Sequence, residues 1–142
     1  MRKCKYVFGI ILIMIIFSLS SCMSLFIPSV IGTWEYKASD EDFLVKIIIT
    51  EQKGEKFSGD LYQKMGEKEL TLKITNGYIN SDGWLDFSCS MLIYDQTSDE
   101  TKNYGLYFSG NLVKDKMYLQ VVERLDGAKQ ATDNMVFNKI YE

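Results

Sequence analysis

The stretch KELTLKIT, at residues 68–75, decides the fold class of this chain. Its apolar residues Leu70, Leu72 and Ile74 alternate strictly with polar ones. Successive side chains of a β-strand point to opposite faces of the sheet, so a period of two predicts a strand with one buried face. No segment of the chain sustains the 3.6-residue period of an amphipathic helix. The sequence therefore favours an all-β protein.

Seven further strands are expected on both sides of this one, separated by turn residues such as Gly, Asn and Asp. Asn76-Gly77 and Asp82-Gly83 are expected to be turns, and residues 96–101 form the longest polar loop. A meander of eight strands has two exposed edges unless it closes on itself. We therefore predict a single small antiparallel up-and-down β-barrel of about eight strands. The seven other strands are expected at residues 32–37, 43–51, 56–63, 84–94, 103–112, 117–125 and 132–141.

The N-terminus has the pattern of an export signal. Arg2, Lys3 and Lys5 precede an apolar run at residues 6–17, YVFGIILIMIIF. A helix needs about 20 residues to span a bilayer, so this run is too short, whereas a basic start followed by a short apolar core is typical of a secretory signal peptide.

The four residues after the signal core, Leu19-Ser20-Ser21-Cys22, resemble the lipobox of bacterial lipoproteins. This resemblance implies cleavage between Ser21 and Cys22 and attachment of lipid to the Cys22 thiol, with palmitate-type acyl chains that hold the protein on a membrane. The chain then divides into a signal peptide (1–21), a lipidated tether (22–30) and the barrel domain (31–142). A plain secretory signal, or an uncleaved anchor with Cys22 incidental, are the alternatives. Met23 after the cysteine favours the outer membrane of a Gram-negative envelope over the inner one.

Composition argues against several classes of function. The chain has no histidine, which removes the usual general base and the commonest ligand of transition metals. We expect no enzyme activity, no metal and no cofactor. Loss of the signal removes three of the 16 basic residues and none of the 19 acidic ones, so the mature net charge is near −6. No basic cluster marks a nucleic-acid partner.

The first predicted strand begins with Gly32-Thr33-Trp34, and this triplet resembles the G-x-W start of the calycins, above all the lipocalins and lipocalin-like bacterial lipoproteins. Phe57-Ser58-Gly59 and Phe108-Ser109-Gly110 resemble the aromatic-x-Gly strands of the same group. The resemblance implies that Trp34 closes one end of the barrel under a basic side chain from the last strand, here Lys139. The family usually has arginine there, and this chain is shorter than a typical lipocalin.

Two functions follow from the predicted barrel. In the first, its inward side chains line an apolar pocket for a small hydrophobic ligand. In the alternative, they pack into a solid core, and the protein is a structural or protein-interaction lipoprotein of the cell envelope, with Tyr62, Tyr94, Tyr107 and Tyr118 on its outer face. Cys89 is expected to be a buried, inert thiol. The candidate pocket residues are Trp34, Tyr36, Phe43, Val45, Ile47, Leu72, Phe87 and Met91.

Overall fold

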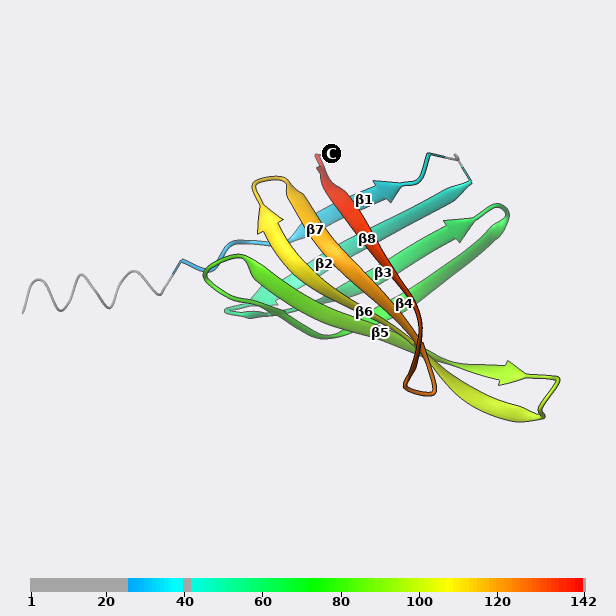
Figure 1. Ribbon diagram of the computed structural model, residues 1–142. Helices are drawn as coiled ribbons and strands as arrows, with labels where there is room; N and C mark the ends of the chain where they lie inside the picture. The colour runs from blue at the N-terminus through cyan, green and yellow to red at the C-terminus, as the bar shows by residue number, and fades with distance from the viewer. Residues whose placement is uncertain (1–25, 40–41, 142) are drawn as a thin grey trace, which may run out of the picture.

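In the computed structural model, which describes residues 26–39 and 42–141, the chain forms a closed antiparallel barrel of eight strands (Figure 1). Each strand pairs with the next one in the sequence, and β1 pairs with β8 to close the barrel. The predicted fold class, an all-β up-and-down barrel, is confirmed. The strands are β1 (Gly32–Lys37), β2 (Phe43–Lys53), β3 (Lys56–Met65), β4 (Lys68–Ile79), β5 (Trp84–Asp95), β6 (Glu100–Val113), β7 (Lys116–Leu125) and β8 (Ala128–Ile140).

The predicted turn at Asn76-Gly77 is wrong, because β4 continues through both residues to Ile79. Asn76 has a φ of 53°, and the register between β4 and β5 shifts between Thr75 and Tyr78. The pair therefore forms a β-bulge. Asn tolerates the positive φ that Asn76 adopts in this bulge, and tight hairpin turns favour Asn for the same reason, so the dipeptide alone does not distinguish the two.

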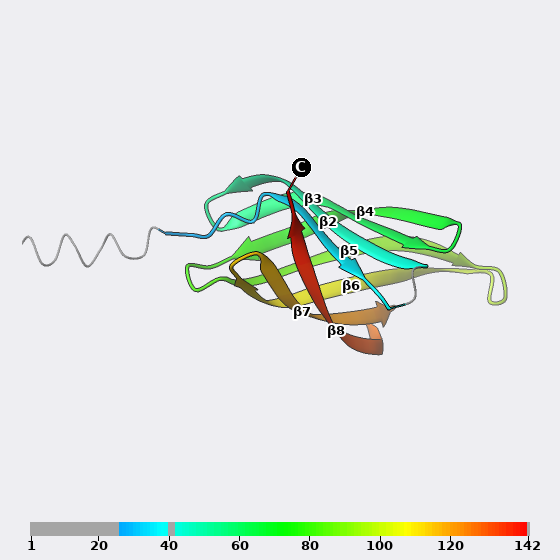
Figure 2. The same cartoon turned by 90° about the horizontal axis from the view of Figure 1, so that it is seen from above.

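The barrel has two ends of different construction (Figures 1 and 2). The turns at residues 54–55, 80–83 and 114–115 lie at what we call the near end, together with residues 26–31, which lead into β1. The turns at residues 66–67, 96–99 and 126–127, with the connection from β1 to β2, lie at the far end.

Part of the β5–β6 hairpin projects beyond the barrel at the far end (Figure 1). Pairing between β4 and β5 stops at Ile74 and Cys89, and β6 pairs with β7 only from Tyr104 onward. Beyond these positions β5 pairs with β6 alone among the described strands. An isolated two-stranded ribbon is marginally stable in water, so the projecting part needs additional polar contacts.

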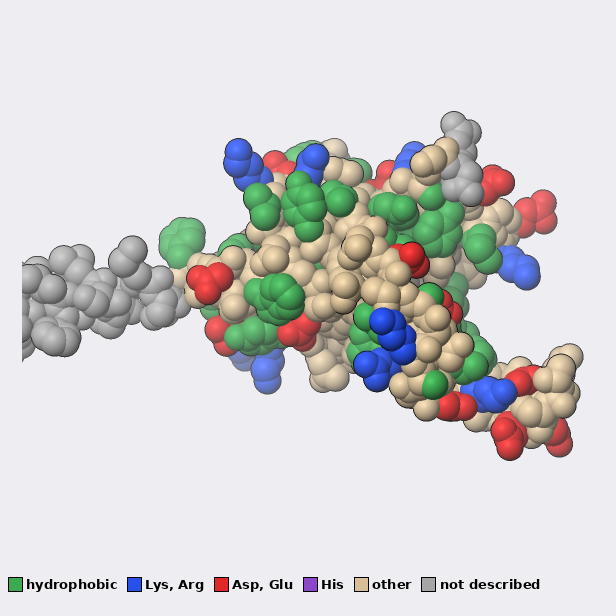
Figure 3. Space-filling model, viewed as in Figure 1, with side chains coloured by type: hydrophobic (Ala, Val, Ile, Leu, Met, Phe, Trp, Pro, Cys, Tyr) green, Lys and Arg blue, Asp and Glu red, His purple; other side chains and the backbone are tan. Residues whose placement is uncertain are grey.

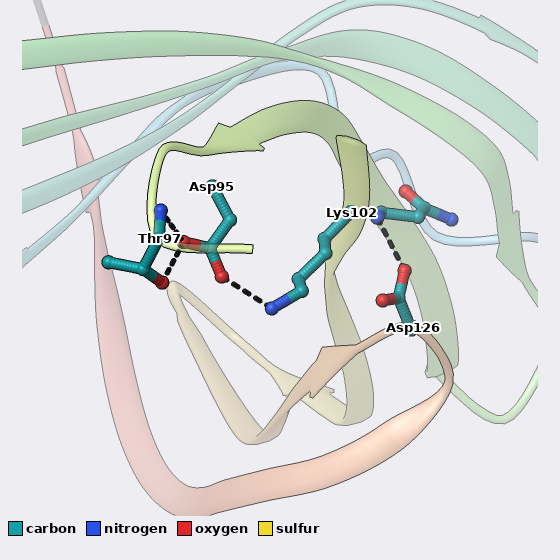
Figure 4. A network of polar contacts seen from close by, with 5 residues as sticks. Asp95, Thr97, Lys102 and Asp126 are labelled. Carbon is teal, nitrogen blue, oxygen red and sulfur yellow. Dashed lines mark hydrogen bonds and ion pairs between the residues drawn. The ribbon is translucent and has the colours of Figure 1, made fainter. Parts of the chain in front are cut away.

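A small polar network supplies those contacts (Figure 4). The Lys102 ammonium donates to Asp95 across the hairpin, and Thr97 donates to the same carboxylate from its backbone and its hydroxyl. The bond from Lys102, followed by those from Thr97, holds the pKa of Asp95 well below its usual range. At the base of the hairpin the backbone N–H of Asn103 donates to the carboxylate of Asp126 in the β7–β8 turn, 2.7 Å away.

The hydrophobic core fills the barrel from the near end. Phe87 stacks on Phe108 with 4.5 Å between ring centroids, and Phe57 meets Phe87 edge to face. The side chain of Phe137 is fully buried and lies against Tyr36. Burial of one such side chain contributes about 1.5–3 kcal/mol, so the stability of the barrel rests on this core.

Candidate functional site

The near end of the barrel is sealed by Trp34, which is only 1% exposed. The Trp34 indole N–H donates to the Val30 carbonyl at 2.9 Å, and the Lys139 Nζ lies 5.3 Å from the centre of the Trp34 ring. The Lys139 ammonium thus makes a cation–π contact with the ring, and the aliphatic part of the lysine side chain covers the indole. Val30 itself is fully buried, and its amide donates to the Gln52 side chain. The segment before β1 is therefore part of the seal.

The far half of the interior is incompletely filled. A hollow of about 110 Å³ lies between β2, β3, β6, β7 and β8. Most of its wall is apolar, with a few polar groups, as is common in pockets for small molecules. Its lining residues are Phe43, Val45, Leu61, Gln63, Tyr104, Leu106, Phe108, Val121, Glu123, Ala131, Asp133 and Met135.

The polar side chains of this hollow have one sign of charge. Glu123 and Asp133 are carboxylates, and no lysine or arginine lines the hollow among the residues that the structure describes. Burial, followed by the negative charge of Glu123 and a hydrogen bond to that carboxylate, raises the pKa of Tyr104 to about 12. Tyr104 is thus a neutral hydrogen-bond donor at physiological pH. The hollow favours a guest that donates hydrogen bonds or carries positive charge over an anionic one.

The candidate residues from the sequence are distributed over three places. Phe43 and Val45 line the hollow. Met91 lies in a lateral groove of about 560 Å³ between the diverging ends of β4 and β5, where Gln63 and Tyr104 also contribute. Tyr36 is half-buried against the core, and the other four, Trp34, Ile47, Leu72 and Phe87, are buried core residues.

Sequence reasoning missed the polar residues of the hollow. Gln63, Glu123 and Asp133 each occupy the inward phase of their strand, two residues from an apolar or small inward residue: Leu61, Val121 and Ala131 respectively. A polar side chain in the otherwise apolar phase of a strand is a signal that the sequence contains, because that phase faces the barrel interior. Read in that way, the alternation would have identified all three.

Cys89 is not a reactive site, and the four outer tyrosines do not form one cluster. Burial, followed by the negative charge of Asp60, raises the pKa of the Cys89 thiol to about 12, and the side chain is fully buried. The tyrosines at 62, 94, 107 and 118 lie on four different strands, and no two of them share a row of paired residues. Cys22 and the expected cleavage point after Ser21 lie outside the described residues.

Comparison of the chain with family models, with curated proteins and with solved structures gives no significant match. The eight-stranded closed barrel is consistent with a lipocalin-like fold. No group of three or more acidic or cysteine side chains in the described ranges could hold a metal ion. The same residues include no helix of the length and hydrophobicity needed to cross a bilayer.

Proposed function

We propose that the protein is a lipoprotein of the bacterial cell envelope, held on the membrane through Cys22, whose lipocalin-like barrel binds a small hydrophobic ligand. The observation that carries the proposal is the asymmetry of the barrel interior. Trp34 and its neighbours fill the near half, whereas the far half retains a hollow with convergent polar groups. A barrel built only for rigidity gains nothing from such a hollow, because an empty cavity lowers stability.

The hollow limits the ligand in size and in charge. A cavity of about 150 Å³ holds a benzene molecule in an engineered protein, so the smaller hollow of 110 Å³ admits at most a single ring or a short alkyl group. Glu123 and Asp133 favour an amine or hydroxyl beside that apolar part. The ligand class is therefore a small amphiphile with a neutral or cationic head. It would enter the hollow from the far end, away from the tether.

Three probes of similar size test this pocket: benzylamine, toluene and benzoate. We expect affinity to fall in that order, because the cation meets the carboxylates and the anion is repelled. Ala131→Leu adds a side chain inside the hollow and is expected to weaken benzylamine binding about tenfold, or by about 1.4 kcal/mol. Binding is followed by NMR shifts of the methyl groups of Val121 and Leu61, which line the hollow.

Thr132→Leu is the matched control, since Thr132 is the exposed neighbour of Ala131 on the same strand. It should leave benzylamine binding unchanged. Binding of equal strength in Ala131→Leu, or no saturable binding of any of the three probes, would contradict the ligand proposal.

The anchor has a test of its own in intact cells. In Cys22→Ala we expect loss of palmitate labelling and accumulation of a precursor that keeps residues 1–21, since the thiol that receives the lipid is gone. Mass spectrometry of the purified protein measures both changes. Cys4→Ala and Cys89→Ala change the other two cysteines and should leave labelling intact. Persistent labelling of Cys22→Ala would refute lipidation at this residue.

One observation favours the second function, a protein-interaction lipoprotein. The projecting part of β5 has apolar side chains on both faces, and Leu92 and Tyr94 are 72% and 60% exposed. Its outer backbone edge is unpaired, and such edges accept strands from other proteins. A photo-crosslinker at position 92 that captures one specific envelope protein would support this function.

A further inference from the structure

Exposed apolar side chains gather around the near end of the barrel. Trp84 begins β5, Val113 ends β6, and Tyr141 follows β8, and these three are 43%, 52% and 71% exposed. Figure 3 shows hydrophobic and lysine side chains together beside the C-terminus and the β6–β7 turn. Isolated exposed apolar residues are ordinary, but a group at one end of a molecule indicates a contact surface.

Trp84 is also the first of three exposed apolar side chains that form a row across the outer wall. Trp84 is paired with Asn111, Asn111 with Tyr118, and Tyr118 with Val136, so the four residues stand side by side on β5, β6, β7 and β8. Tyr118 and Val136 are 47% and 39% exposed. These three apolar residues, together with Gly110, which has no side chain, help to line a surface hollow of about 390 Å³. We call Trp84, Tyr118 and Val136 the apolar row.

Charge is polarised along the barrel in the same direction. The near end contains five lysines, at positions 53, 56, 114, 116 and 139, against Glu55, Asp82 and Asp115. Counted in the same way, over the described turns and the last two residues of each strand, the far end has the opposite excess, with Asp42, Glu67, Glu69, Asp95, Asp99, Glu100 and Asp126 against Lys37, Lys64, Lys68, Arg124 and Lys129. The near end thus has a net positive charge and the far end a net negative one.

We propose that the near end, with the apolar row, is a membrane-contact surface that rests on an anionic lipid bilayer. Tryptophan and tyrosine prefer the boundary between lipid and water, since each has an apolar ring and a polar atom. Lysines are attracted to anionic headgroups. The apolar row supplies the first feature and the five near-end lysines supply the second.

The place of the anchor supports the same orientation, and this step rests on the lipidation proposed above. Cys22 precedes Phe26 by four residues, which span at most about 14 Å when fully extended. Phe26 is 90% exposed and lies at the near end. A lipid on Cys22 would therefore hold this end, and not the far end, within reach of the headgroups.

The test uses a chain that starts at Met23 and so has no lipid. All eight strands and the buried core lie within residues 27–141, so this chain contains the whole folding unit. We expect it to sediment with vesicles that contain about 30% phosphatidylglycerol and to bind pure phosphatidylcholine vesicles about tenfold more weakly. Tyr118→Ser with Val136→Ser should weaken the first interaction about tenfold, while Leu92→Ser with Tyr94→Ser, at the far end, should not.

Brominated acyl chains report contact directly, because they quench tryptophan fluorescence at close range. Trp84 is exposed and Trp34 is buried, so only Trp84 should be quenched. Trp84→Phe should still bind but lose the quenching. Absence of vesicle binding, including the case where the row binds only a protein, would overturn the proposal, as would binding that depends on Leu92 and Tyr94. Because no lipid is attached in this experiment, its outcome is independent of the Cys22→Ala test.

Discussion

Trp34→Ala is expected to lower the free energy of unfolding by about 3–5 kcal/mol, the range for removal of a large buried aromatic side chain. The change empties the near end of the barrel, because the indole fills it and is 1% exposed. It also leaves the Val30 carbonyl without its donor and the Lys139 ammonium without the ring beneath it. Urea denaturation followed by circular dichroism measures the loss.

Two variants separate the parts of this effect. Trp34→Phe keeps an aromatic ring but removes the N–H, so we expect a smaller loss of about 1–3 kcal/mol. Trp84→Ala removes the other tryptophan of the chain, which is 43% exposed, and should cost less than about 1 kcal/mol. Equal stability losses in Trp34→Ala and Trp84→Ala would show that Trp34 does not seal the barrel.

Gly110→Ala is expected to destabilise the barrel by about 3 kcal/mol, at the upper end of the cost of overpacking. A Cβ at this position would lie 1.9 Å from the Tyr118 carbonyl oxygen, on the backbone of the neighbouring strand. The backbone of β7 cannot retreat without breaking the ladder between β6 and β7. Thermal unfolding of the variant measures the change.

Gly105→Ala is the matched control on the same strand. The nearest atom to its added Cβ, at 3.0 Å, is on the ring of Tyr107, a side chain that is 45% exposed and can turn away. We expect a cost below about 1 kcal/mol. If Gly105→Ala were as damaging as Gly110→Ala, general strand propensity and not the close approach to Tyr118 would be the cause.

The period-two pattern predicted the fold because each strand has one buried face. β1 was predicted with its exact bounds, Gly32–Lys37, since Gly32 opens it and polar residues follow it. The strands were mostly observed to be longer than predicted, as in β6, which begins at Glu100 inside the expected polar loop. Pairing with a neighbouring strand stabilises polar residues that have no strand preference of their own.

The site was less predictable than the fold. Alternation identifies inward side chains, but the height of each one in the barrel depends on strand tilt and stagger, which the sequence does not state. Ile47 and Val45 are successive inward residues of β2, yet only Val45 reaches the hollow. Phe108 was placed correctly on a strand, but the sequence does not show that it lines the hollow and stacks on Phe87.

The closure of the barrel has a consequence for how the chain folds. Seven of the eight strand contacts join neighbours in the sequence, and these hairpins can form early with little loss of chain entropy. The contact between β1 and β8 joins the two ends of the domain and comprises only three residue pairs, Thr33–Ile140, Trp34–Lys139 and Glu35–Asn138. We therefore expect β1 and β8 to pair last during folding and to separate first in local opening of the native barrel. Trp34 and Lys139 form the middle one of these three pairs. The side chains that seal the near end therefore also hold β1 against β8 and keep the barrel closed.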